Sequence, residues 1–256
     1  MTPDAASDWT RPAMFLLEGT GALGEADAVT LEGEEGRHAA DVRRVRTGEV
    51  VLVGDGAGAR ARVEVLEVAR GRVVGRVLAR RDDAVPEPRV TVVQALVKGD
   101  RGELAVELAT EAGADTVVPW RAERCVARWD DGPRGAKSLA RWRSTAREAA
   151  KQARRAVAPE VTEARSTAQV ADRLRGAAAG LVAEGTADAS LASVGLPPRG
   201  EIVLVVGPEG GLTPDERATF AEAGAVGVRM GAGVLRTSTA GAVALGALGV
   251  RTGRWT

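Results

Sequence analysis

The chain has 256 residues, 45% of them hydrophobic and 27% charged, which is enough to bury a large core in one or two domains. Its 35 basic and 35 acidic residues cancel, so net charge indicates no class of partner. Cys125 is the only cysteine, which excludes an intramolecular disulfide and suits a reducing compartment. The apolar runs at 14–17 and 242–250 are too short for a signal peptide or a membrane span. We therefore expect a soluble, cytoplasmic protein without a membrane partner.

The first part of the chain, from about residue 14 to residue 80, has β character. Apolar and polar residues alternate in segments separated by the turn signals Gly54-Asp55-Gly56 and Arg70-Gly71, and the segments lie at 50–53, 61–68 and 72–78. Such alternation predicts a small antiparallel barrel or sandwich over residues 1–83. Two prolines and no periodicity mark residues 84–88 as a linker.

From residue 89 onward, predicted strands and helices alternate. Apolar strands are expected at 90–97, 116–119, 180–183, 202–206 and 226–230. Helices are expected at 102–112, at about 135–156, from Ser166 onward, between the last two strands, and at about 239–249. This order predicts an α/β domain over residues 89–256, with a parallel sheet covered by helices on both faces.

A glycine-rich loop at 205–216 follows one of these buried strands. Three glycines within five residues let the backbone approach a ligand, and Thr213, Pro214 and Glu216 form a helix start with a capping box. Open α/β sheets bind ligands at this edge. The spacing differs from the glycine motifs of dinucleotide and triphosphate sites, which disfavours both. The alternative is an ordinary strand-to-helix turn without a ligand.

A second glycine loop follows at 228–242, again between a strand and a helix start. Arg236 precedes that helix, where the helix dipole favours anions over cations. This placement favours a role in binding an anion or polarising a substrate, and an ion pair with an acidic side chain is the alternative. The last helix is almost entirely Ala, Gly, Val and Leu, so we expect it to be packed on both sides.

Positive charge is concentrated in the predicted helix between residues 134 and 155. Only Glu148 opposes the eight cations Arg134, Lys137, Arg141, Arg143, Arg147, Lys151, Arg154 and Arg155. This excess predicts a phosphate-binding face, with a solvated helix face as the alternative. Trp142 within it could stack on a base, although a core position is more common for tryptophan. For His38, the lone histidine, a structural role is favoured over an RNA contact or catalysis.

Two segments resemble signature loops of a known family. VGPEGGLTPDE at 206–216 and LRTSTA at 235–240 are similar to those of the RsmE-type 16S ribosomal RNA uracil-N3 methyltransferases, which belong to the SPOUT superfamily. Further similarities are found along the chain at Glu111, Gly113, 123–125, Gln152, Pro159-Glu160, and His38, Val42 and Arg44.

The resemblance implies methylation of N3 of a uridine in 16S ribosomal RNA, with S-adenosylmethionine as methyl donor and no metal. It implies a PUA-like N-terminal β-barrel, a SPOUT domain whose chain forms a trefoil knot, and a homodimer that acts on the RNA or the small ribosomal subunit. Arg236 would be catalytic. RNA would be bound by His38, Arg44, Arg124, Arg147, Lys151, Arg154 and Arg155. The donor would contact Ala183, Glu184, Val206, Gly207, Pro208, Glu209, Gly210, Gly211, Met230, Gly231, Val234, Leu235, Thr237, Ser238, Thr239 and Ala240.

Three positions depart from the family pattern. Ser238 and Lys151 stand where many relatives have Glu, and Leu108 stands where Lys is frequent. Ser238 cannot act as an acid or base at neutral pH. Two other functions stay open: a SPOUT methyltransferase acting on transfer RNA ribose, and an RNA-binding assembly factor without activity. The PUA-like domain and LRTSTA disfavour the first, and the intact glycine loops disfavour the second.

Overall fold

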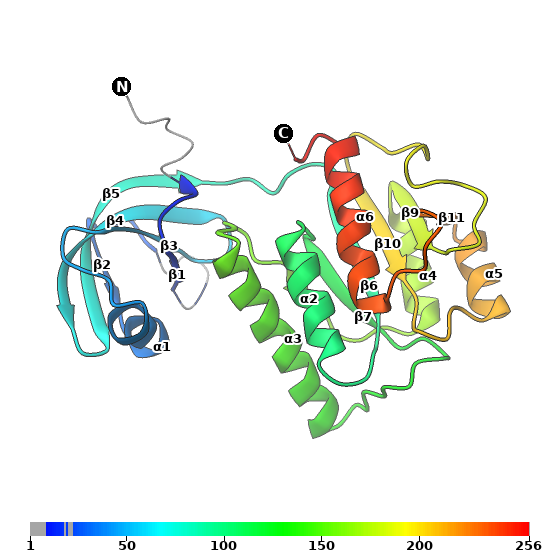
Figure 1. Cartoon of the computed structure of the whole chain (residues 1–256), viewed down its shortest axis with the longest axis horizontal. Helices are drawn as coiled ribbons and strands as arrows, with labels where there is room; N and C mark the ends of the chain where they lie inside the picture. The colour runs from blue at the N-terminus through cyan, green and yellow to red at the C-terminus, as the bar shows by residue number, and fades with distance from the viewer. Residues whose placement is uncertain (1–8, 18, 20–22, 256) are drawn as a thin grey trace. The chain divides into compact units, whose positions relative to one another are not determined.

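A computed structural model describes residues 9–17, 19 and 23–255, which form two compact units (Figure 1). The N-terminal unit extends to Val85 and also contains Ala150–Ala158. The second unit comprises Pro86–Ala149 and the chain from Pro159 onward. The prediction of two domains at 1–83 and 89–256 divides the chain at a single point, and it therefore misses that residues 150–158 belong to the first unit.

The N-terminal unit is a five-stranded sheet with two helical turns. Its strands are β1 (Met14–Leu16), β2 (Ala28–Leu31), β3 (Val50–Gly54), β4 (Ala59–Ala69) and β5 (Arg72–Asp82), in the order β1-β3-β4-β5-β2. Between β2 and β3 lie α1 (Gly33–Arg37) and the π-helical turn η2 (His38–Val42). The expected alternation is confirmed in β4, where Ala61, Val63 and Val65 are buried. The expectation of a purely antiparallel sheet is wrong at its edge, because β1 pairs with β3 in parallel.

Residues 156–158 make main-chain contacts with the turn between β3 and β4 of this unit. Val157 bridges to Ala57, and the Gly58 amide donates to the Ala156 carbonyl at 3.2 Å. The predicted helix to residue 156 is therefore wrong at its end: α3 (Pro133–Gln152) stops where Arg154 takes a left-handed φ of 54°. The main-chain bonds of residues 156–158 to residues 56–58 take the place of further helical bonds.

The second unit contains a six-stranded sheet in the order β11-β9-β10-β6-β7-β8, with every pairing parallel. The strands are β6 (Arg89–Ala95), β7 (Thr116–Trp120), β8 (Glu160–Val161), β9 (Ala179–Ala183), β10 (Glu201–Val206) and β11 (Val226–Val228). Besides α3, the helices are α2 (Arg101–Glu111), α4 (Thr167–Gly176), α5 (Pro214–Glu222) and α6 (Thr237–Arg251). The predicted α/β architecture is thus confirmed.

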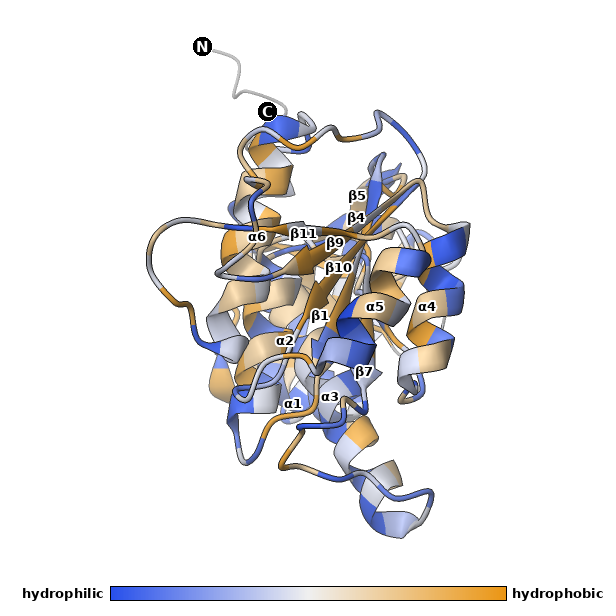
Figure 2. Cartoon of the chain, turned by 90° about the vertical axis from the view of Figure 1, so that its right-hand side faces the viewer, coloured by the Kyte–Doolittle hydropathy of each residue, from blue (hydrophilic) through white to orange (hydrophobic). Residues whose placement is uncertain are grey.

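Helices cover both faces of this sheet. Figure 2 shows α2 and α6 on one side of the apolar strands β9 and β10, and α4 and α5 on the other. Central strands are buried on both faces, which explains their continuous apolar sequences, such as Ile202 to Val206. In the described part of the chain, no helix has the length and apolar character needed to cross a membrane.

Both predicted capping boxes are present. The Ser166 hydroxyl accepts from the Gln169 amide at the start of α4, and the Thr213 hydroxyl accepts from the Glu216 amide at the start of α5. In each case the side chain three residues on returns the bond to the capping residue's amide. Each box satisfies two amides that the helix leaves without partners, and so fixes where the preceding loop ends.

Candidate functional site

The carboxyl ends of three neighbouring strands meet at one level of the second unit's sheet. Ala183 at the end of β9 lies in register with Val206 of β10 on one side and with Val228 of β11 on the other. Each strand continues into a loop on this edge, and two of these loops are rich in glycine. The arrangement exposes main-chain polar groups around a single point.

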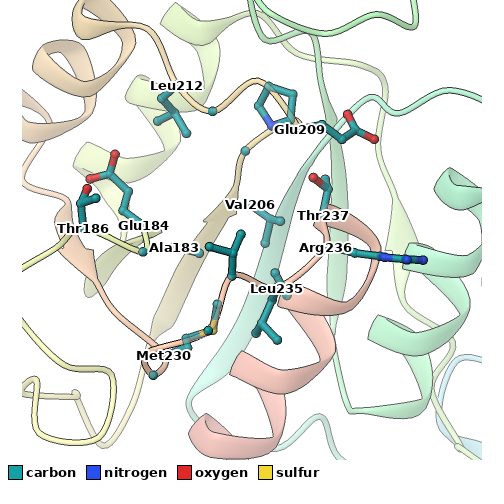
Figure 3. Close-up of a pocket in the computed structure, with 18 of the residues that line it drawn as sticks. Ala183, Glu184, Thr186, Val206, Glu209, Leu212, Met230, Leu235, Arg236 and Thr237 are labelled. Atoms are coloured by element: carbon teal, nitrogen blue, oxygen red, sulfur yellow. The ribbon is translucent and has the colours of Figure 1, made fainter.

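The three loops surround a hollow of about 490 Å³, within the size range of sites for small organic ligands (Figure 3). It brings together fourteen of the seventeen residues predicted to bind the donor or to catalyse, and these are Ala183, Glu184, Val206, Gly207, Pro208, Glu209, Gly211, Met230, Gly231, Val234, Leu235, Arg236, Thr237 and Ala240. Gly210, Ser238 and Thr239 do not line it.

The glycine loop requires glycine at two positions. A β-carbon at Gly207 would lie 2.5 Å from Cδ1 of Leu212, a buried residue of the lining, so any side chain there displaces the wall. Gly211 has a φ of 67°, which strains other residues. The lining is mainly apolar, with polar main chain at the strand ends, and this combination suits an adenosyl group with an amino-acid tail.

Glu216 holds the glycine loop from behind. Its buried carboxylate accepts from the amide of Thr213 at 2.9 Å, the amide of Glu123 at 2.8 Å and the hydroxyl of Thr167 at 3.3 Å. One side chain therefore joins the glycine loop to the loop after β7 and to the start of α4. Because buried donors lose much when unpaired, this carboxylate fixes the shape of the hollow's wall.

Arg124 contacts the same glycine loop from outside. Its Nη1 donates to the carbonyl of Gly210 at 3.0 Å and to that of Leu212 at 3.3 Å. Arg124 was predicted to bind RNA, but the contacts seen here are with its own chain, and they position the loop. The sequence signal for this role is the Glu123-Arg124 pair after β7. The Glu123 amide bonds to Glu216, and Arg124 bonds to the Gly210 carbonyl.

Arg236 is the N-cap residue of α6, and its carbonyl accepts the amides of Thr239 and Ala240. Its guanidinium is exposed, and no acidic side chain in the described part of the chain forms an ion pair with it. The structural alternative, an arginine held by an acid, therefore finds no support. Figure 3 shows Arg236 at the edge of the hollow, directed away from Leu235. A positive charge is thus available to a group that enters from this edge.

Sequence reasoning missed several lining residues, namely Arg101, Gly185, Thr186, Leu212, Arg217 and Gly233. Arg217 forms an ion pair with Glu184, which closes one side of the hollow. Arg101 comes from the first turn of α2. The available signal for Arg101 was its place after β6, because β6 is the neighbour of β10 and its loop opens on the same edge.

The predicted phosphate-binding face of α3 is partly neutralised. Arg141 pairs with Glu103, Arg143 with Glu163, and Lys151 with Glu35. Arg134 and Lys137 are exposed on its first turns. Trp142 is a core residue, packed on Gly102 and edge-on to Trp129. The alternative of a core position, and not that of stacking on a base, is therefore correct.

The other predicted RNA-binding residues are spread over two units. His38 is half-buried with its ring edge-on to Phe15, Arg44 is exposed, and Arg154 lies beyond the end of α3. Arg147 and Arg155 are half-buried. Of the seven residues, only His38, Lys151 and Arg154 line a common hollow, which belongs to the N-terminal unit.

Two chemical features complete the description of the second unit. Burial raises the pKa of the Cys125 thiol, which therefore stays protonated at neutral pH. Among the described residues no group of His, Cys, Asp and Glu is arranged to hold a metal ion.

Comparison with known families finds two matches. Residues 85–249 match the RNA methyltransferase domain family, and residues 31–78 match the RNA methyltransferase PUA domain family. The first match covers more than half of the chain and includes every residue that lines the hollow at the ends of β9, β10 and β11.

Individual relatives agree with these matches. Ribosomal RNA small subunit methyltransferase E of Mycobacterium tuberculosis is 51% identical over 243 residues, covering 93% of this chain and 90% of that protein. Its counterpart from Bacillus subtilis is 32% identical, covering 89% and 92%. The crystal structure of the enzyme of the same name from Neisseria gonorrhoeae, bound to S-adenosyl methionine, has a TM-score of 0.82 and 28% identity, covering 94% of this chain and 98% of that one.

Proposed function

This chain belongs to the ribosomal RNA small subunit methyltransferase E family, and from that premise we propose that it methylates N3 of a uridine in 16S ribosomal RNA. The observation that carries the proposal is the hollow at the ends of β9, β10 and β11, with an unpaired arginine at its edge. The SAM-bound relative from Neisseria gonorrhoeae supports the choice of methyl donor.

The residues of the hollow fit S-adenosylmethionine. The apolar side chains of Val206, Leu212 and Leu235 would enclose the adenine, and the main chain at 207–211 and 230–235 would supply polar partners. When bound, this molecule supplies a methyl group already activated by a positively charged sulfur. The chain's own task is then to align the two reactants and to prepare the nucleophile.

The nucleophile is an imide nitrogen that holds its proton at neutral pH. The N3 proton would leave first, and we assign it to water. N3 would then bond to the methyl carbon as the bond from that carbon to the donor's sulfur breaks, which would leave a neutral thioether. Between these two events the negative charge of the deprotonated imide spreads onto the uracil oxygens, where the exposed guanidinium of Arg236 can stabilise it. Ser238 is buried and does not line the hollow, so we assign it no part in this step.

We assign RNA binding to the N-terminal unit, on the basis of its PUA-family match. His38, Lys151 and Arg154, predicted from sequence, lie there around one hollow. We also propose a cytoplasmic location, which an rRNA substrate favours.

We further propose the trefoil knot and the homodimer of the family. The segment 189–194 is hydrogen-bonded to both ends of the stretch from Arg229 to Arg251. The Leu191 carbonyl accepts from Nη1 of Arg251 at 2.7 Å, and the Leu191 amide donates to the Arg229 carbonyl at 2.9 Å. This supports a chain threaded beneath that segment. In α6 Val243 is 46% exposed and Val250 68%, so this helix is not packed on both sides as expected from its composition, and Val234 in the loop before it is 95% exposed. A second subunit would cover these apolar side chains.

The test is methyl transfer to 16S ribosomal RNA that lacks the modification, followed by mass mapping of the product. We expect one N3-methyluridine, and a methyl group on transfer RNA ribose would support the first alternative instead. Arg236→Ala should lower the single-turnover rate about 100-fold, with donor affinity retained, and Arg236→Lys should recover part of it. Full activity of Arg236→Ala would exclude the catalytic role. Donor binding without any transfer would favour the assembly factor.

A further inference from the structure

A second hollow, of about 130 Å³, lies wholly within the N-terminal unit. Three distant parts of the sequence form it: the start of β1, the turn η2 with its exit, and the end of α3. It is lined by Ala13, Met14, Phe15, His38, Arg43, Lys151, Gln152 and Arg154. Neither the family matches nor the names of the relatives assign a ligand to it.

Lys151 is part of the wall and does not supply free charge. Its side chain is 3% exposed, and its ammonium donates to Oε1 of Glu35 at 2.7 Å. The second oxygen of Glu35 accepts the amide of Leu16 at 3.1 Å, which ties the pair to β1. This buried pair therefore sets the distance between the end of α3 and the strand that forms the floor.

Positive charge in the hollow comes from Arg43 and Arg154. In the described part of the chain, neither forms an ion pair with an acidic side chain. Arg154 is anchored by its Nε, which donates to the Pro12 carbonyl at 2.9 Å, so its two terminal nitrogens keep their donors for another partner. Two guanidinium groups beside one small hollow suit a phosphate group.

The backbone beside the hollow is strained at two arginines. Arg44, next to the lining residue Arg43, and Arg154 both have a φ of 54°, and they are the only described residues other than glycine with positive φ. Glycine or asparagine adopts this conformation more easily. Strained residues persist where the surrounding structure or the function requires them, so this observation points independently to a binding site.

The remaining walls suit a base. Phe15 is buried beside the hollow, and the half-buried ring of His38 stands edge-on to it with a centroid separation of 5.9 Å. Gln152 is exposed at the rim, and its amide can both donate to a base edge and accept from it. Unpaired RNA bases are recognised by stacking on such rings and by contacts to their edges. A hollow of about 130 Å³ has room for one base, with its sugar and phosphate at the rim, and excludes a paired helix.

We propose that this hollow binds one unpaired nucleotide of the RNA substrate, with its phosphate at Arg43 and Arg154 and its base at His38 and Gln152. The proposal rests on the proposed function and specifies how the N-terminal unit selects RNA. It predicts a preference for single-stranded over duplex RNA, because a base within a helix cannot enter the hollow.

The test compares binding of a fluorescent single-stranded oligoribonucleotide, and of the duplex of the same sequence, at several salt concentrations. Arg43→Ala should weaken single-strand binding about 10-fold and reduce the salt slope by about 0.7, the value for one lost phosphate contact. His38→Ala should weaken it about 10-fold with no change in slope, because stacking carries no charge. Arg70→Ala is the matched control: it removes the same charge from an exposed turn of the same unit and should change affinity less than about twofold.

The outcomes separate this proposal from the proposed function. Equal effects of Arg43→Ala and Arg70→Ala, or equal binding of duplex and single strand, would overturn the hollow as a nucleotide site. Donor binding and methyl transfer by the unaltered chain are measured separately, and their absence would overturn the proposed function alone. Circular dichroism and donor affinity unchanged from the unaltered chain would show that each variant is folded.

Discussion

The two hollows of the protein are built in different ways. At the ends of β9, β10 and β11, glycine-containing loops form much of the wall, and the exposed Arg236 stands at the edge. In the N-terminal unit, side chains from three distant segments form the hollow, and a buried ion pair holds it open. The first depends on the shape of loops and the second on the identity of side chains, so different changes should damage them.

The largest effect is expected from Glu216→Ala in the second unit. The change leaves the amide of the buried Thr213 and the amide of Glu123 without an acceptor, which should cost about 2 kcal/mol in the free energy of unfolding and weaken donor binding. Tryptophan fluorescence during urea unfolding measures this, because Trp120, Trp129 and Trp142 all belong to the second unit.

Glu216→Gln is the matched control, since its amide oxygen keeps one acceptor. Its free energy of unfolding should fall by less than half as much as that of Glu216→Ala. Binding of RNA by the N-terminal hollow should be unchanged in both variants. A loss of single-strand binding equal to the loss of donor binding would show that the two hollows are not independent.

The next effect is expected from Lys151→Met in the N-terminal unit. The variant leaves the carboxylate of Glu35 facing an apolar side chain, and because Glu35 is 18% exposed we expect about 2 kcal/mol of destabilisation, below the cost for a fully buried pair. Hydrogen exchange in β1 and β3 should report it, while β9 and β10 stay protected. The double variant of Lys151→Met with Glu35→Gln should regain part of the stability. Equal hydrogen exchange in the single and the double variant would argue against the role of the ion pair.

The smallest effect is a gain, expected from Arg44→Gly. Glycine relieves the left-handed backbone at this exposed position, which should stabilise the N-terminal unit by about 0.5–1 kcal/mol after the extra entropy of the unfolded chain is subtracted. Arg44→Ala removes the same side chain but keeps the strain and should give no gain. Thermal unfolding of the two variants measures the difference, and a loss of stability in Arg44→Gly would contradict the strain.

The same contrast explains what could be predicted from sequence. Most strands, both capping boxes and most residues of the hollow at the ends of β9, β10 and β11 were predicted, because glycines and caps at strand ends are local signals and parallel strand ends share one edge. The short strands β2 and β8 were not predicted. The end of α3 was not predicted, because the sequence at 153–156 favours helix while residues 156–158 bond to the turn between β3 and β4 instead. Arg101, Arg217 and the N-terminal hollow were also missed, since their positions depend on contacts between distant segments without a local pattern.

The central claim is that the loops at the ends of β9, β10 and β11 bind S-adenosylmethionine. Titration calorimetry of the purified chain with this donor tests it directly, alongside Gly207→Val and the control Gly176→Ala, whose new methyl group meets open space. The account predicts one site per chain, at least about 10-fold weaker in Gly207→Val, because the new side chain displaces Leu212, and unchanged in Gly176→Ala. No binding by the unaltered chain, or equal affinity in a folded Gly207→Val variant, would contradict it.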